Sequence, residues 1–176
     1  MIYASYNSYE NDYMNPHFKI ETVEDAVNIA ACQLSNIGES FEQEGLFVIT
    51  MSEKNEVKTV RLLALGDFNT IKISSNEICK QAIRDDAKNI LILHNHPRSN
   101  SGSLTPSEAD IRVTDVILQG CSLLQLRLLD HIIVSSTFQK DHKFYSMRQD
   151  KIIDFDYYFK PENLDFCKNA SELKWR

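Results

Sequence analysis

Two histidines, His94 and His96, stand one residue apart directly after the apolar run NILIL at residues 89–93. A short continuous apolar run of this kind is typical of a strand that is buried on both faces. Side chains two positions apart on an extended segment point to the same side, so both imidazoles can reach one point while Asn95 points away. The sequence therefore predicts two imidazole groups side by side at the end of a buried strand.

A helix is predicted to follow in TPSEADIRVTDVILQG, residues 105–120. Thr105 is placed to serve as its N-cap, Pro106 occupies the first helical position, and Glu108 completes a capping box. Gly120 marks the far end of the predicted helix.

Ser107 and Asp110 lie three positions apart in the first turns of this helix, so their side chains share one face. If the helix start meets the strand end, two imidazoles, one carboxylate and one hydroxyl surround a single point. Two histidines and one carboxylate, with a fourth position open to water, match the ligand set of a catalytic zinc, whereas structural zinc sites have four protein ligands. Zinc lowers the pKa of its bound water to about 7, which suits a hydrolase at neutral pH.

Each of these residues also has a structural explanation. A lone H-x-H pair more often lies in a turn or on the surface, Ser107 suits an early helical position, and Asp110 is favourable near a helix N-terminus. The conjunction of both motifs, on two elements that a short loop must bring together, favours the metal site.

The remaining elements indicate an α/β (α+β) fold, a mixed sheet flanked by helices. Residues 22–38 predict a first helix with a capping-box variant between Thr22 and Asp25, and residues 45–65 predict a β-hairpin. A short extended segment is expected at residues 70–74.

A second helix is expected after Ser74, whose capping box would be completed by Glu77, with Ile78, Ala82 and Ile83 buried. Two further strands are predicted at residues 123–129 and 131–135.

Bulk composition narrows the function classes. A chain of 176 residues with 43% hydrophobic residues and a net charge of −6 indicates a globular domain without the basic surface of a general nucleic-acid binder. The four cysteines form no C-x-x-C pair, which favours free thiols in a reducing compartment. No signal peptide or membrane-spanning stretch is recognised, so we expect a cytoplasmic protein without membrane association.

The stretch HNHPRSNSGSLTPSEADI resembles the JAMM motif of the JAB/MPN metalloprotease superfamily, a distant Glu followed by H-x-H-P and S-x-x-D. QEGLFVITMSEKNEV, LLDHIIVSS and KFYSMRQD are similar to segments of the RadC-like branch, and the likeness covers about residues 20–149. The resemblance implies the JAB/MPN fold, related to cytidine deaminases, with Zn²⁺ held by His94, His96 and Asp110.

The same resemblance places the catalytic glutamate on Glu44, as general base toward the zinc water and then proton donor to the leaving amine. Glu42, two residues earlier on the same face, is the alternative. Ser107 would hold the substrate carbonyl oxygen as negative charge develops there.

Three segments follow from the extent of the likeness: an N-terminal arm at residues 1–19, the RadC-like JAB/MPN domain at 20–149, and an acidic, aromatic extension at 150–176. The aromatic residues of that extension could dock a partner or fold back on the domain. The pair Asp130 and His131 also matches the RadC-like pattern, and a hydrogen-bonded structural pair between strands is the expected role.

These observations predict a zinc-dependent peptidase or isopeptidase of JAMM type whose substrate is a protein or peptide, including a ubiquitin-like protein. Two alternatives stay open: a RadC-like factor associated with DNA repair, and an MPN-type interaction module without catalysis. The acidic charge argues against the first, and the complete set of ligand types argues against the second. The sequence predicts no oligomeric state.

Overall fold

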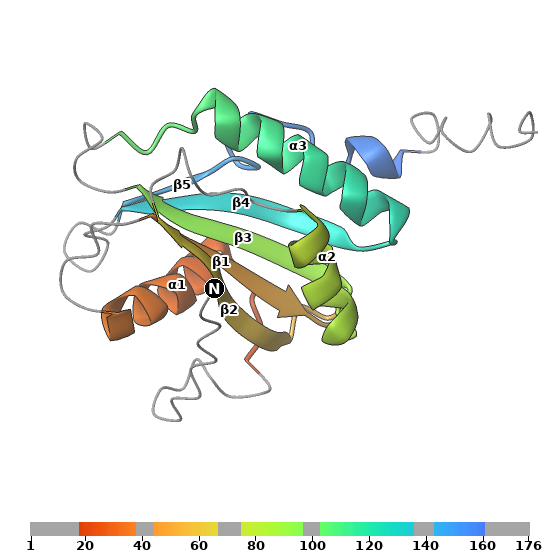
Figure 1. Ribbon diagram of the computed structural model, residues 1–176, viewed down its shortest axis with the longest axis horizontal. Helices are drawn as coiled ribbons and strands as arrows, with labels where there is room; N and C mark the ends of the chain where they lie inside the picture. Colours follow the sequence, from red (N-terminus) through yellow and green to blue (C-terminus); the bar gives the residue numbers. More distant parts are fainter. Residues whose placement is uncertain (1–17, 38–43, 67–74, 97–102, 136–142, 161–176) are drawn as a thin grey trace, which may run out of the picture.

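A computed structural model describes residues 18–37, 44–66, 75–96, 103–135 and 143–160. Its centre is a five-stranded mixed sheet of strand order β2-β1-β3-β4-β5, with β3 and β4 parallel and the other neighbours antiparallel (Figure 1). The predicted α+β class is therefore confirmed. The elements in chain order are α1 (Val23–Ile37), β1 (Glu44–Met51), β2 (Val57–Gly66), α2 (Ser75–Arg84), β3 (Asn89–His96), α3 (Glu108–Leu123), β4 (Arg127–Ser135), β5 (Phe144–Ser146) and a 3-10 turn, η2 (Tyr157–Phe159).

The first helix and the hairpin form where the sequence predicted them. Thr22 Oγ1 accepts a hydrogen bond from the Asp25 amide at 3.1 Å, and the Asp25 carboxylate accepts one from the Thr22 amide at 2.9 Å. This reciprocal pair satisfies amides that have no partner within the helix. The expected extended segment at residues 70–74 and the Ser74 cap lie outside the described residues.

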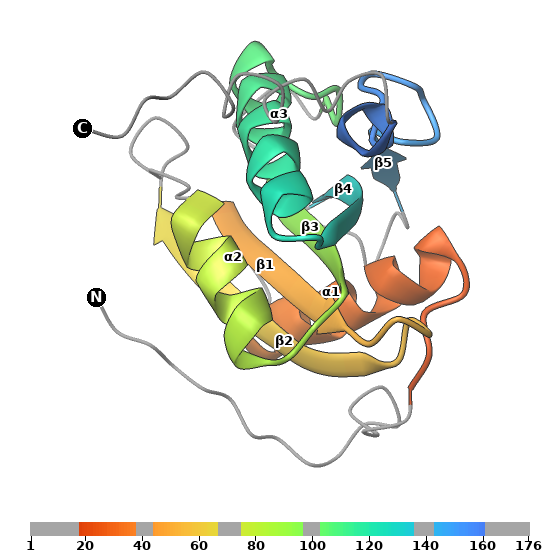
Figure 2. The same cartoon turned by 90° about the vertical axis from the view of Figure 1, so that its right-hand side faces the viewer.

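Helices cover both faces of the sheet (Figure 2). Alternate residues of β1 divide between the two layers, since Phe47 and Ile49 join a hydrophobic cluster with α1, whereas Leu46 and Val48 join one with α2 and α3. The strand β3 is buried along almost its whole length, as its uninterrupted apolar run predicted. Its even-numbered residues, Ile90 and Ile92, face α3.

Three local predictions are wrong. The third helix begins at Glu108 with Ser107 as its N-cap, rather than at Pro106 with Thr105 as the cap. It continues through Gly120 to Leu123, because Leu124 makes the C-terminal cap. Ile83 is 58% exposed rather than buried.

The prediction of two strands at residues 123–129 and 131–135 is also wrong: Leu123 ends α3, residues 124–126 form a turn, and residues 127–135 are one strand, β4. The register between β3 and β4 shifts between Ile90 and Leu91, because Ile90 pairs with Leu128 and Leu91 pairs with Asp130. Leu129 is therefore the extra residue of a β-bulge. Downstream of this bulge the alternation of β4 is reversed, so that Ile132 faces α1 and His131 faces α3.

The first part of the C-terminal extension packs on the domain. Phe155 is 2% exposed within the cluster that holds α2 and α3, and the Tyr158 hydroxyl donates to Asp115 of α3 at 2.8 Å. Tyr157, in contrast, is 47% exposed. The boundary at residue 149 stays a prediction, and residues 161–176 lie outside the described part.

Among the described residues, Cys32, Cys79 and Cys121 are free thiols, whereas Cys167 lies outside them. None of the helices in this described part of the chain is both long enough and apolar enough to cross a bilayer.

Candidate metal centre

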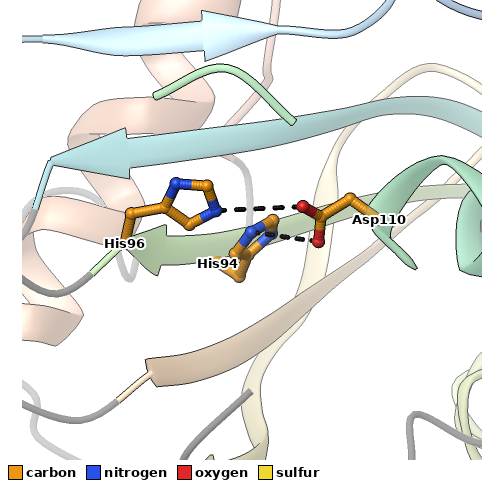
Figure 3. Close-up of side chains that lie close together, drawn as sticks. All are labelled: His94, His96 and Asp110. Carbon is orange, nitrogen blue, oxygen red and sulfur yellow. Dashed lines mark ion pairs between the residues drawn. The ribbon is translucent and has the colours of Figure 1, made fainter. Parts of the chain in front are cut away.

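His94 and His96 lie two positions apart at the C-terminal end of β3, as the sequence predicted. Both side chains lie on the face of the sheet that α3 covers, and Figure 3 shows them directed toward the start of that helix. His94 is 2% exposed, whereas His96 lies nearer the surface. Asn95 points to the opposite face, where its side-chain oxygen accepts a hydrogen bond from the Gly45 amide at 2.8 Å.

Asp110 reaches the histidines from the first turn of α3. Its Oδ2 atom accepts hydrogen bonds from the Ser107 amide and from Ser107 Oγ, both at 2.7 Å, while Ser107 Oγ also accepts one from the Asp110 amide. These bonds form a capping box that fixes the direction of the carboxylate. The Asp110 side chain has no exposed surface, so its charge lies in the protein interior.

The three candidate ligands converge. His94 Nε2 lies 3.4 Å from Asp110 Oδ1, His96 Nε2 lies 3.9 Å from Asp110 Oδ2, and one ligand atom from each residue lies within 4.8 Å of the others (Figure 3). Two ligand atoms of a tetrahedral zinc ion are roughly 3.3 Å apart, so the group has nearly the size that the ion requires.

The hydrogen bonds of His96 and Asp110 leave ligand atoms that suit a bound cation. His96 Nδ1 lies 3.0 Å from the Ser103 carbonyl oxygen, which can only accept, so the proton of a neutral His96 stays on Nδ1 and Nε2 presents a lone pair. Asp110 Oδ1 is buried and makes no hydrogen bond among the described residues. A buried carboxylate oxygen beside imidazole lone pairs fits Zn²⁺, which takes nitrogen and oxygen ligands.

The Nδ1 atom of His94 contacts a second buried histidine, His131 of β4. His94 Nδ1 lies 2.8 Å from His131 Nε2, and His131 Nδ1 lies 2.6 Å from Thr114 Oγ1 on α3. Burial, and after it the neighbouring His96, lowers the pKa of His94 to about 3. Burial and the neighbouring His94 likewise lower the pKa of His131 to about 3, so both rings are neutral at pH 7.

Glu44 is the first residue of β1 and is 3% exposed. Alternation along β1 puts it on the face of Leu46, which pairs with His94 across the strands, so Glu44 shares the face that carries both histidines. The bond from the Gly45 amide to Asn95 fastens this end of β1 to β3. The alternative base, Glu42, lies outside the described residues.

The side chains of Asp130 and His131 have different hydrogen-bond partners, which the sequence did not predict. Asp130 bridges strands as expected, because its carboxylate accepts hydrogen bonds from Ser146 Oγ at 2.5 Å and from the Arg148 amide at 3.0 Å. Only the His131 amide bonds to it, while the His131 ring turns to His94. The His131 ring is thus also hydrogen-bonded between strands, as predicted, but its partner is His94 of β3 rather than Asp130. The bulge that turns it has no local sequence signal.

Comparison with known sequences places the residues of the candidate metal centre within a known family domain. The sequence model of the family described as RadC-like JAB domain matches residues 20–152, which is most of the chain. The chain belongs to this family.

Its relatives include UPF0758 proteins, a name that states no activity. The chain is 39% identical to that of Chlorobium chlorochromatii over 107 residues, which cover 61% of this chain and 45% of the relative. It is 32% identical to that of Roseiflexus castenholzii over 132 residues, which cover 75% and 52%. The matched part of the chain thus spans about half the length of these relatives.

Proposed function

We propose that this domain is a zinc-dependent hydrolase of JAMM type that cleaves a peptide or isopeptide bond. The observation that carries the proposal is the convergence of His94, His96 and the buried Asp110 carboxylate, in a chain of the RadC-like JAB family. His94, His96 and Asp110 would hold the ion. Zinc bound there would lower the pKa of a water ligand and polarise the substrate carbonyl.

Glu44 is the proposed general base and acid. Its carboxylate, on the same face as both histidines and almost fully buried, takes a proton from the attacking water and returns it to the nitrogen of the leaving amine. The carbon–nitrogen bond then breaks, giving a carboxylic acid and an amine. Burial keeps competing water away from the carboxylate, which favours proton transfer within the site.

Ser107 is the proposed donor to the substrate carbonyl oxygen. Ser107 is an exposed residue, and its hydroxyl lies beside the Asp110 carboxylate, to which it donates at 2.7 Å. On substrate binding the hydroxyl would turn from Asp110 Oδ2 to the carbonyl oxygen, where negative charge develops in the transition state. The Ser107 amide would continue to hold Asp110 Oδ2.

An outer strand of the sheet supports a polypeptide substrate. Among the described strands β2 is an outer strand, and its last residue, Gly66, pairs with Glu44. An extended polypeptide laid along β2 would form main-chain hydrogen bonds and bring its end to the site. A protein with an extended C-terminal tail, such as a ubiquitin-like protein, is therefore the proposed substrate.

Cleavage of probe peptides tests this proposal. The zinc-loaded protein is incubated with a library of unstructured peptides and with ubiquitin carrying a C-terminal peptide extension, and products are identified by mass spectrometry. We expect cleavage that a chelator removes and added zinc restores. Zinc binding without cleavage of any probe would instead favour an interaction module of the MPN type.

A further inference from the structure

Two buried residues outside the ligand set, His131 and Thr114, connect the candidate ligands to each other. Both are fully buried, and they come from β4 and α3. The contacts form a series: Asp110 carbonyl oxygen to Thr114 Oγ1 at 2.6 Å, Thr114 Oγ1 to His131 Nδ1 at 2.6 Å, and His131 Nε2 to His94 Nδ1 at 2.8 Å. The series begins at the main chain of Asp110 and ends at the ring that faces its carboxylate.

The Asp110 carbonyl sets the direction of every bond in this series. A carbonyl oxygen can only accept, so the single hydroxyl proton of Thr114 is donated to it. The Met147 sulfur, 3.7 Å from the same hydroxyl, is a much weaker acceptor. Thr114 Oγ1 must then accept from His131, which places the His131 proton on Nδ1.

The direction passes on to His94. A neutral His131 with its proton on Nδ1 has a lone pair on Nε2, so it accepts from His94 Nδ1. The proton of a neutral His94 is therefore fixed on Nδ1, and its Nε2 lone pair faces Asp110 Oδ1 at 3.4 Å. This is the tautomer that a metal ion bound through Nε2 requires.

The bulge in β4 makes the series possible. Leu128 faces α3 and Leu129 faces α1, so regular alternation would direct the His131 ring toward α1. The extra residue at Leu129 reverses the alternation and turns His131 toward Thr114 and His94. β-Bulges are frequent beside active sites, where they redirect a side chain.

We propose that Thr114 and His131 are positioning residues that lock His94 in the tautomer needed for metal binding. The inference rests on the proposed metal site and extends it to residues that touch neither metal nor substrate. Partners of this kind behind a metal ligand change metal affinity by about 10- to 100-fold when they are removed.

Paired substitutions at Thr114 test the inference. Thr114→Val keeps the side-chain shape and removes the hydroxyl, whereas Thr114→Ser keeps the hydroxyl. Zinc affinity is measured by competition with a chromophoric chelator, and the His94 tautomer is measured in metal-free protein from the ¹⁵N shifts of its ring. We expect Thr114→Val to weaken zinc binding about 10- to 100-fold and to lose the single Nδ1-protonated form, while Thr114→Ser stays close to the wild type.

Two substitutions at His131 test the same inference if Thr114→Val does not fold. The amide group of His131→Gln takes roughly the place of Nε2 and can accept from His94, whereas that of His131→Asn takes the place of Nδ1 and cannot reach it. The glutamine variant should therefore bind zinc more tightly than the asparagine variant.

The two proposals fail in different ways. The positioning role of Thr114 and His131 would be overturned if Thr114→Val kept the zinc affinity and the His94 tautomer of the wild type. It would also be overturned if the two His131 variants bound zinc equally tightly. Either result would leave the proposed metal site standing. A folded wild-type protein that binds no zinc would overturn the metal site. A His94 proton found on Nε2 in the metal-free wild type would by itself overturn the positioning role of Thr114 and His131.

Discussion

Ser107 and Asp110 cap each other at the start of α3, and the carboxylate of this pair is also the one that faces His94 and His96. One capping box thus both begins the helix and aims a candidate metal ligand. Ser107→Ala should lower the free energy of unfolding by about 1 kcal/mol, because the Asp110 amide loses its acceptor. It should also weaken zinc binding, because Asp110 Oδ2 loses a donor.

Thr105→Ala is the matched control for Ser107→Ala, since the sequence alone favoured Thr105 as the cap. Thermal unfolding and zinc titration of both variants separate the two positions. A larger loss of stability in Thr105→Ala than in Ser107→Ala would contradict the observed start of α3.

Replacement of the proposed base should separate catalysis from metal binding. In Glu44→Gln we expect zinc content to stay at the wild-type level and peptide cleavage to fall by about 10²- to 10⁴-fold, the usual contribution of a general acid–base group. Glu42→Gln is the control. If Glu42→Gln abolishes cleavage and Glu44→Gln retains it, Glu42 is the base.

Asp85 joins the end of α2 to the hairpin and should make stability depend on pH. Its carboxylate accepts hydrogen bonds from Gln81, Thr50 and Thr59 at 2.6–2.8 Å. Burial raises the pKa of Asp85, but these bonds and the charge of Arg61 together hold it below its ordinary value. Asp85→Asn should lower the free energy of unfolding by about 1–2 kcal/mol at pH 7, because an amide cannot accept all three bonds.

The sign of the pH effect follows from the lowered pKa. An unfolded Asp titrates near pH ~3.9, so the stabilisation by Asp85 is complete above that pH and is lost as the pH falls through the lower folded value. The difference between wild type and Asp85→Asn in urea unfolding should therefore shrink below about pH 4. The exposed neighbour Asp86 provides the control, Asp86→Asn, and a constant difference at every pH would contradict the role of Asp85.

The packed start of the C-terminal extension can be tested by two aromatic substitutions. Phe155→Ala should lower the free energy of unfolding by about 3–5 kcal/mol, because it leaves a cavity beside α2 and α3. Tyr157→Ala, at an exposed position, should change it by only about 0.5 kcal/mol. Equal small effects in chemical denaturation would mean that residues 150–160 are not part of the folded domain.

The candidate ligands could be predicted because their signals are local. Alternation on a strand fixes the relation of His94 to His96, and helical spacing fixes that of Ser107 to Asp110. The helix start was misplaced because TPSE and SEAD both fit a capping box two residues apart. The local pattern cannot choose between them.

The role of His131 could not be predicted, because it depends on contacts between distant segments. Asp130 interrupts the apolar pattern of residues 123–135, which made one strand look like two. In the structure Ser146 and Arg148, from the next strand and the turn after it, satisfy the Asp130 carboxylate. The bulge at Leu129 then decides which face His131 occupies, and no residue near it in the sequence signals that choice.

The zinc content of the purified protein tests the central claim most directly. Elemental analysis is made on wild type, on Asp110→Ala, and on Glu108→Ala, which removes an exposed carboxylate from the same turn of α3. Circular dichroism establishes that each protein is folded. We expect about one zinc per chain in wild type and Glu108→Ala and a sharp loss in Asp110→Ala, as an open three-ligand site requires. Folded wild-type protein that takes up no zinc, or an Asp110→Ala variant that binds it as tightly as wild type, would contradict the account.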